Sequence, residues 1–303
     1  MHFSNDIYYN NEYIKLYGEV FIFENVENGK YFKIIANKIP IKQTPYYDLQ
    51  STYGYSGIVC NTNDEEFIKI SFDKFKQLAK KENIIAFFIR FHPFDSNIQI
   101  YEKYLNFCKC EKKVVIVELS QDYTKIKKQY QKKNKYAINQ ARKIINISRC
   151  DKRDNLKFYT LYKETMIRNN ANEFYFFNEK YFEKLWSFDD YIAFKASLNC
   201  EEIAFASFFM GKDISYYHLS ANTLKSNANA ALLDYFFEYA GNKGLKYCVL
   251  GGGIKDDDNL FSFKQKFSKN YKYFYIGGIV INEQIYNYLC SQYNNPYFLK
   301  YRM

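Results

Sequence analysis

The sequence lacks the cysteine spacing that marks metal-binding and disulfide-rich proteins. None of its seven cysteines forms a CxxC pair, and Cys108 and Cys110 are too few for a metal site. An odd number of cysteines in apolar surroundings, such as Cys60, Cys248 and Cys290, suits reduced thiols rather than a disulfide framework. The sequence therefore predicts a protein of a reducing compartment that holds no metal.

Long apolar runs and a secretory leader are also missing. No stretch approaches the ~18 apolar residues that a membrane span needs, and the first residues show no basic region followed by an apolar core. With 303 residues, of which 48% are hydrophobic, the chain is long enough for one large or two ordinary domains, each with a core. These features predict a globular, cytoplasmic protein, with peripheral attachment at the inner membrane face and the oligomeric state left open.

Neither a GxGxxG motif nor a P-loop is present, yet residues 214–253 have the pattern of a phosphate-binding unit. A strand over 214–222 is followed by a polar turn, a helix that opens on the small residues Asn227, Ala228 and Asn229, a short apolar strand and three glycines. The exposed backbone N–H groups and the positive end of that helix could hold a pyrophosphate. The alternative is an ordinary crossover between two strands with a flexible turn.

Positive charge is concentrated in residues 121–153, which contain eleven Lys or Arg and only two acidic residues. The net charge of the whole chain is +10. Apolar residues there fall at helical spacing, which predicts a helix with one buried and one cationic face. Such a face is often only solvated. As a binding surface it would suit tRNA phosphates, a nucleotide-sugar diphosphate or anionic lipid. Its small aliphatic and Tyr residues favour packing on a core over lying in a membrane.

The remaining segments predict an α/β (α+β) chain. An Asn28-Gly29 turn joins strands over 19–24 and 31–36, and further strands are expected at 84–91, 114–119, 191–198, 203–210 and 271–281. Helices are expected at 73–81, 155–169 and 178–186. No internal repeat is visible.

Four motifs, in order, resemble the FemABX-like branch of the GNAT acyltransferase superfamily. They are TPYYDLQSTYGYSG at 44–57, FIRFHPF at 88–94, LYKETMIRNNANEFYFF at 161–177, and LGGG at 250–253 followed by LFSFKQKFS at 260–268. The resemblance implies two GNAT-like domains, each a mixed, mostly antiparallel sheet flanked by helices, with a cleft between them. The acceptor side would be residues 1–120 plus 271–303, and the donor side residues 121–270.

The family resemblance also implies acyl transfer onto an amine. Such a reaction needs a base, a donor for the developing oxyanion and exact placement, but no covalent nucleophile. The preferred hypothesis is transfer of a short acyl group, such as acetyl from acetyl-CoA, to an amino sugar, nucleotide-linked, for cell-surface glycan synthesis. The alternative is aminoacyl-tRNA-dependent transfer onto a peptidoglycan precursor. It is less favoured because the chain lacks the long helical-hairpin insertion expected of several tRNA-dependent relatives. A non-enzymatic module that binds nucleic acid or lipid is the third reading.

The predicted site residues fall into three groups. The catalytic candidates are His218 and Asp256, and the residues expected to hold the donor are Leu219, Ala221, Asn227, Ala228 and Asn229. The residues expected to contact the acceptor are Tyr53, Tyr55, Arg90, His92, Tyr175, Tyr216, Gly252, Gly253 and Lys264.

Each of the charged candidates has a plainer structural alternative. His218 could be hydrogen-bonded within the sheet, and the acidic run at Asp256 could cap the next helix. Arg90 could form a structural salt bridge, and Lys264 could extend along the helix surface.

Overall fold

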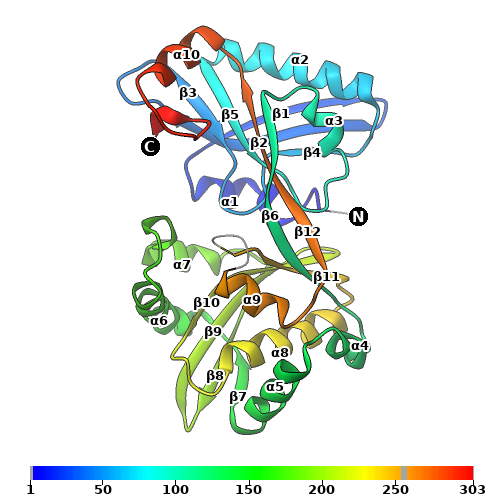
Figure 1. Ribbon diagram of the computed structural model, residues 1–303, viewed down its shortest axis with the longest axis vertical. Coiled ribbons are helices and arrows are strands. Elements are labelled where there is room, and N and C mark those ends of the chain that lie inside the picture. Colours follow the sequence, from blue (N-terminus) through cyan, green and yellow to red (C-terminus); the bar gives the residue numbers. More distant parts are fainter. Residues whose placement is uncertain (1–2, 254–257, 303) are drawn as a thin grey trace. The chain divides into compact units, whose positions relative to one another are not determined.

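The computed structural model describes residues 3–253 and 258–302, which form two compact units (Figure 1). Unit 1 covers Lys113–Lys272 with the first residues of the chain, and unit 2 covers Ser4–Lys112 and Tyr273–Met303. Two strands, β6 (Phe107–Glu118) and β12 (Tyr271–Val280), begin in one unit and end in the other. Within the described part of the chain, no helix is both long and apolar enough to cross a membrane.

The sheet of unit 2 has the strand order β1-β2-β3-β5-β12, and β4 pairs with β2. Its elements are η1 (Ile7–Tyr9), α1 (Asn11–Lys15), β1 (Glu19–Glu27), β2 (Lys30–Pro40), β3 (Tyr47–Gln50), β4 (Ile58–Cys60), α2 (Glu65–Lys81), β5 (Ile84–Arg90), α3 (Ile98–Glu102), α10 (Glu283–Ser291) and η4 (Lys300–Arg302). The predicted hairpin is confirmed: Asn28 and Gly29 both have positive φ, which a tight turn of this kind requires.

Helix α2 is longer than the sequence predicted. It was expected over 73–81, but it begins at Glu65, because the Asp64 side chain accepts a hydrogen bond from the Phe67 amide and so caps the helix. The apolar residues of its buried face, from Phe67 to Ala79, continue one helical stripe across both halves.

The sheet of unit 1 has the strand order β6-β11-β10-β9-β8-β7. Its elements are α4 (Tyr123–Lys128), α5 (Lys132–Ile144), β7 (Asn146–Arg149), η2 (Lys152–Asp154), α6 (Asn155–Arg168), η3 (Glu173–Tyr175), α7 (Glu179–Leu185), β8 (Tyr191–Leu198), β9 (Glu201–Met210), β10 (Ile214–Asn222), α8 (Ala228–Asn242), β11 (Tyr247–Gly251) and α9 (Asn259–Gln265). In Figure 1, α8 and α5 lie on one face of strands β7 to β10, and α6 and α7 lie on the other. Stacked rings join each layer to the sheet: Phe236 to Phe208 on the α8 face, and Phe158 to Phe205 on the α6 face.

The cationic segment is two helices rather than the single helix expected. Helix α4 ends at Lys128, the Tyr130 side chain turns into the core, and Gln131 is the N-cap residue of α5. One of the segment's cations is only partly exposed: the Arg142 side chain is 28% exposed and pairs with Asp234 of α8 at 2.7 Å. Asp234 also accepts hydrogen bonds from the Tyr123 and Tyr130 hydroxyls. This fully buried carboxylate therefore ties α4 and α5 to α8.

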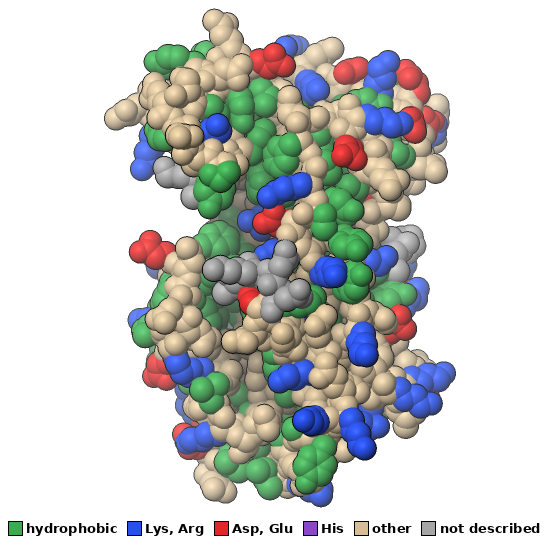
Figure 2. All heavy atoms as spheres, in the orientation of Figure 1, with side chains coloured by type: hydrophobic (Ala, Val, Ile, Leu, Met, Phe, Trp, Pro, Cys, Tyr) green, Lys and Arg blue, Asp and Glu red, His purple; other side chains and the backbone are tan. Residues whose placement is uncertain are grey.

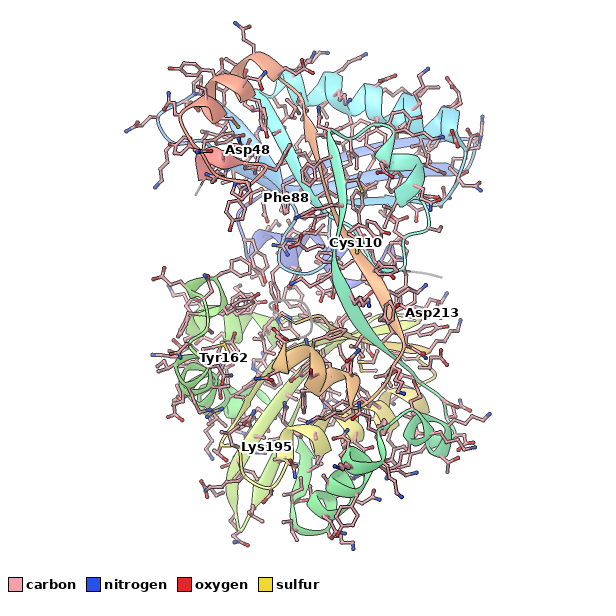
Figure 3. All side chains as sticks on the ribbon, viewed as in Figure 1. Asp48, Phe88, Cys110, Tyr162, Lys195 and Asp213 are labelled. Atoms are coloured by element: carbon pink, nitrogen blue, oxygen red, sulfur yellow. The ribbon has the colours of Figure 1, made fainter. Side chains whose placement is uncertain are left out.

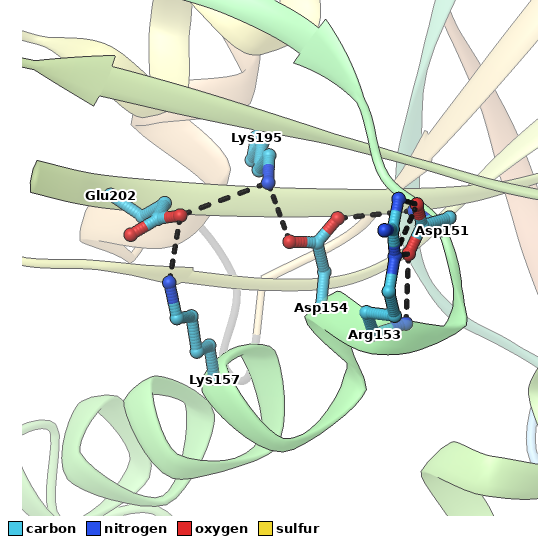
Figure 4. A network of polar contacts seen from close by, with 6 residues as sticks. All are labelled: Asp151, Arg153, Asp154, Lys157, Lys195 and Glu202. Atoms are coloured by element: carbon cyan, nitrogen blue, oxygen red, sulfur yellow. Dashed lines mark hydrogen bonds and ion pairs between the residues drawn. The ribbon is translucent and has the colours of Figure 1, made fainter. Parts of the chain in front are cut away.

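A second polar network fixes the start of α6 to strands β8 and β9 (Figure 4). Lys195 of β8 binds Asp154, whose other oxygen accepts the Asp151 amide in a capping box, and Glu202 of β9 pairs with Lys157 at 2.9 Å. The Lys195 ammonium has a raised pKa because of its hydrogen bond to Asp154. The Lys195 ammonium therefore stays charged at neutral pH, and the network holds α6 against the sheet.

Candidate functional site

The candidate site lies in unit 1 where strands β10 and β11 separate. The two strands run parallel and are paired only from Ile214 with Tyr247 to Tyr216 with Val249. Beyond that point β10 stays on β9, with a register shift between Tyr217 and Ser220, whereas β11 stays on β6. The backbone edges that face each other past Tyr216 are therefore not joined into a ladder, and an extended ligand could hydrogen-bond to them.

The start of α8 follows directly after β10. Leu224, Ser226 and Asn227 all have left-handed backbone conformations, with φ of 66°, 55° and 52°. Asn227 is the N-cap residue, yet its side chain makes no capping hydrogen bond. The first-turn amides of a helix have no partner within the helix, and its dipole is positive there, so this opening is suited to an anion such as a diphosphate.

Four side chains on the α8 face lie around the separation of the strands. The Tyr217 hydroxyl donates to Ser220 Oγ, and Asn229 Nδ2 lies 3.5 Å from the Tyr217 oxygen. Cys248 of β11 is fully buried, and burial raises the pKa of its thiol to about 12, so it is a neutral packing residue. Sequence analysis missed Tyr217, Ser220 and Cys248, because nothing in a strand pattern signals where two strands diverge.

The predicted donor residues are near this point but do not all present free amides. The Leu219 N–H donates to Ser207 Oγ of β9 at 3.2 Å, and the Ala228 N–H donates to the Lys225 carbonyl at 3.2 Å. Ala221 is buried and pairs with Phe205 of β9. The backbone N–H groups best placed to hold the acyl donor are therefore those of Asn227 and Asn229 at the helix start.

His218 lies on the opposite face of β10 and is buried. Its Nε2 is 2.8 Å from the Tyr181 hydroxyl, and its ring packs on Phe209 with centroids 4.7 Å apart. Burial lowers the pKa of the imidazole to about 3, so it is neutral across the physiological range. In this environment His218 is a hydrogen-bonding group of the sheet, and service as a base stays a prediction that requires substrate or water to reach it.

Lys264 of α9 holds the glycine loop. Its ammonium donates to the Gly252 carbonyl at 2.7 Å, and the side chain is 7% exposed, so it does not extend along the helix surface. Asp258 caps α9 by accepting a hydrogen bond from the Phe261 amide. Helix capping is the structural role that the sequence offered as the alternative for the acidic residues around position 256. Asp256, the second catalytic candidate, lies outside the described residues. Gly253 lies next to Gly252 and is half-buried.

The remaining unit 1 candidates are structural neighbours of this region. Tyr216 is 1% exposed at the last position where β10 pairs with β11. The Tyr175 carbonyl accepts a hydrogen bond from the hydroxyl of Tyr162, the α6 residue labelled in Figure 3. This bond fixes the turn after α6, which carries the aromatic residues of the third motif.

Four predicted acceptor residues belong to unit 2 and form their own cluster. The Tyr55 ring packs edge-on against His92, Tyr8 and Phe274. The buried His92 ring accepts the Phe94 amide at Nδ1, and burial lowers its pKa to about 3.

The other two acceptor candidates flank this cluster. The Tyr53 carbonyl accepts the Tyr13 hydroxyl at 3.1 Å. The Arg90 amide donates to Ser51 Oγ, and the Arg90 charge lowers the pKa of Tyr55, although burial dominates and raises it. The sequence candidates thus gather into two groups, one in each unit. Among the described residues, no group of three or more His, Cys, Asp or Glu could hold a metal ion.

Solved structures of other proteins share this fold over most of the chain. FemX has a structure that matches this one with a TM-score of 0.75 at 14% identity, covering 92% of this chain and 93% of FemX. L-PGS from Bacillus licheniformis matches with a TM-score of 0.61 at 13% identity, covering 88% of this chain and 86% of that one. A conserved protein of unknown function from Bacteroides thetaiotaomicron matches with a TM-score of 0.56 at 11% identity, covering 85% of this chain and 86% of that one.

At these identities the likeness concerns the fold. It confirms the predicted mixed, mostly antiparallel α/β fold and the resemblance to the FemABX-like branch. No protein-family model and no curated protein sequence matches the chain.

Proposed function

We propose that this protein is an acyltransferase that holds its acyl donor between β10 and β11, with the donor's phosphates at the start of α8. The observation that carries the proposal is the separation of the two strands beside a helix whose N-cap side chain makes no cap bond. An extended donor could pair with the open strand edges while its anionic end meets the helix dipole. The likeness to FemX, over nearly the whole of both chains, supports this use of the fold.

The preferred donor is an acyl-CoA, with acetyl-CoA as the simplest case. Its pantetheine arm is an extended chain with two amide groups, which can hydrogen-bond to backbone edges in the manner of an added strand. Its diphosphate suits the left-handed turn and helix start at Leu224, Ser226 and Asn227. An aminoacyl ester at the end of a tRNA has no such amide arm.

The acceptor in this proposal is the amine of an amino sugar, nucleotide-linked, for surface glycan synthesis. The neutral amine attacks the thioester carbonyl, a C–N bond forms, and the C–S bond breaks to release the CoA thiol. The proton lost by the amine passes to a base, for which His218 and Asp256 are the candidates, and the thiolate takes up a proton as it leaves. A backbone N–H near the strand separation would stabilise the oxyanion.

A second candidate is aminoacyl-tRNA-dependent transfer onto a peptidoglycan precursor. The family that the sequence resembles includes such transferases, and FemX is aligned over 93% of its own length with 92% of this chain. The long helical-hairpin insertion expected of several tRNA-dependent relatives is not found in this sequence, which is why this candidate stands second. The cationic residues of α4 and α5 add to this second candidate.

Calorimetric titration with acetyl-CoA tests the proposed donor. We expect 1:1 binding that weakens about tenfold in Asn227→Asp, because an isosteric negative charge at the helix start repels the diphosphate. Asn242→Asp is the matched control, since it makes the same charge change at the opposite, exposed end of α8 and should leave affinity unchanged.

Two results would contradict the preferred donor. If acetyl-CoA gives no heat while an aminoacyl-tRNA binds, the second candidate replaces it. If Asn227→Asp and Asn242→Asp weaken binding equally, the anion does not sit at the start of α8.

A further inference from the structure

A second hollow in unit 1 lies away from the strand separation. It has a volume of about 490 Å³ and lies between the turn that joins α4 to α5 and the turn that follows α9. Its lining residues are Lys128, Gln129, Tyr130, Gln131, Lys132, Ser268, Lys269 and Asn270. None of them belongs to the group around β10 and β11, so this hollow is a separate feature of the surface.

Hydrogen bonds hold the backbone and several side chains of the walls, whereas the three lining lysines, Lys128, Lys132 and Lys269, are exposed. Gln129 exchanges two hydrogen bonds with the backbone of Glu118, and the Tyr130 hydroxyl is held by the buried Asp234. The Gln131 amide donates to the Lys266 carbonyl, and Asn270 donates its backbone N–H to Ser268 Oγ. A ligand would therefore meet a preformed cavity.

Three lysines, Lys128, Lys132 and Lys269, line the hollow, and no acid does. Within residues 3–253 and 258–302 none of the three forms an ion pair. Two carboxylates contact other lining residues: Glu118 accepts from the Asn270 side-chain amide, and Asp234 accepts from the Tyr130 hydroxyl. Among the described cations of residues 121–153, Arg142 pairs with Asp234 and Arg153 with Asp151, and the others form no ion pair. What sets Lys128, Lys132 and Lys269 apart is that they line one cavity. Figure 2 shows Lys and Arg side chains gathered over the region of α4 and α5.

The helix that begins at the hollow adds to its positive potential. Helix α5 has 13 residues and starts at Lys132, and the side chain of its N-cap residue Gln131 makes no capping hydrogen bond. The amides of its first turn and its dipole therefore act in the same direction as the three ammonium groups. Ser268, which is 1% exposed, supplies a buried hydroxyl to the same cavity.

We propose that this hollow binds a small diphosphate anion, either free pyrophosphate or the diphosphate of a nucleotide. Three uncompensated ammonium groups around one cavity match the charge of a diphosphate, and the hollow is large enough for a nucleotide. A site for a nucleic acid strand would instead have its cations spread along an extended groove. Here the three lysines line one hollow. This inference does not depend on acyl transfer and concerns residues that the proposed donor site does not use.

The test compares two triple variants of the full chain. Lys128→Gln with Lys132→Gln and Lys269→Gln removes the lysines of the hollow, whereas Lys125→Gln with Lys135→Gln and Lys143→Gln removes three exposed lysines of α4 and α5 that do not line it. Both lower the charge by the same amount. Inorganic pyrophosphate and ADP are titrated into each protein by calorimetry at ~0.15 M salt, where charges more than ~8 Å from the ligand are largely screened.

We expect pyrophosphate or ADP to bind the unmodified protein 1:1, with affinity lost at least tenfold in the first variant and changed less than about threefold in the second. A stronger response to ADP than to pyrophosphate assigns the site to a nucleotide, and the reverse order assigns it to free pyrophosphate. Equal losses in both variants, or no binding of either anion at millimolar concentration, would overturn the proposal. Binding of a single-stranded RNA oligonucleotide without binding of either small anion would also overturn it. Equal melting temperatures confirm that both variants fold, and a triple Lys→Arg variant of the hollow should keep binding.

Discussion

Burial decides the chemistry of the two histidines that the sequence singled out. His92 is fully buried and His218 is 7% exposed, and for each of them desolvation lowers the pKa to about 3. Both residues were candidates in the sequence, His92 within the motif at 88–94 and His218 on the strand expected over 214–222. Their protonation could not be predicted, because it depends on side chains far away in the chain, such as Tyr181 beside His218.

The lowered pKa of His218 predicts how stability depends on pH. Between pH 6.5, the ordinary histidine pKa, and about pH 3, the unfolded chain binds a proton at this residue and the folded chain does not. Stability from this effect is therefore fully present above pH 6.5 and falls as the pH is lowered, by about 1.4 kcal/mol per pH unit. We expect the difference in free energy of unfolding between the unmodified protein and His218→Gln to shift by about 2 kcal/mol between pH 7.5 and pH 5, measured by urea denaturation.

Tyr181→Phe is the control for this prediction. It removes the hydrogen bond to Nε2 but leaves the buried imidazole, so it should lower stability without changing the pH slope. A His218→Gln variant with the same pH slope as the unmodified protein would show that the imidazole is not kept neutral.

At the scale of elements, the sequence predicted best where one apolar pattern occupied one segment. The expected strand over 214–222 is β10, and strands β8 and β9 lie where alternation and short polar turns predicted them. The pattern predicted less well where the burial of one residue interrupts a helix. The cationic segment divides at Gln129 to Gln131 because Tyr130 turns inward to Asp234, a residue more than a hundred positions later.

The last turn of α8 contains a glycine that packing requires. A Cβ at Gly241 would lie 2.3 Å from the Ser120 carbonyl oxygen, a backbone atom that cannot move alone. Alanine is the better helix former by about 1 kcal/mol, but the overlap should outweigh this gain. We expect Gly241→Ala to destabilise the protein by about 1 to 3 kcal/mol, measured as the free energy of unfolding in urea.

Asn242→Ala is the comparison, since this neighbouring residue of the same turn is exposed. It should change stability by less than about 0.5 kcal/mol. A stabilising Gly241→Ala would mean that propensity, and not contact with residue 120, decides this position.

At the scale of the whole molecule, the chain's last described residues return to unit 2. Arg302 donates from Nε to Asp48 at 2.6 Å and from a second nitrogen to the carbonyls of Ile39 and Pro40, and the Tyr301 hydroxyl donates to the same carboxylate. Asp48, labelled in Figure 3, is completely buried, and this burial raises its pKa despite the bonds from Arg302. Tyr301 and Arg302 thus bind the buried carboxylate of Asp48, a residue of β3 more than 250 positions earlier in the chain.

Removing the Arg302 side chain should leave the buried Asp48 carboxylate without a counter-charge. We expect Arg302→Met to destabilise unit 2 by about 3 kcal/mol or more, because the desolvated carboxylate loses its counter-charge. Urea denaturation measures the change. Asp48→Asn in the same background removes the charge and should recover part of the loss, and a double variant no more stable than Arg302→Met would contradict this account.

The sequence by itself determined the elements of this protein and the order of its motifs, because helical and strand periodicity, turns and caps are set by residues close together along the chain. The four motifs were enough to indicate the fold that the likeness to FemX confirms. Only the tertiary structure decided which side chains are buried, where β10 leaves β11, that Lys264 holds the Gly252 carbonyl, and that three lysines line one hollow. Those features depend on contacts between residues far apart in sequence, and such contacts form only when the sheet and its helices pack together.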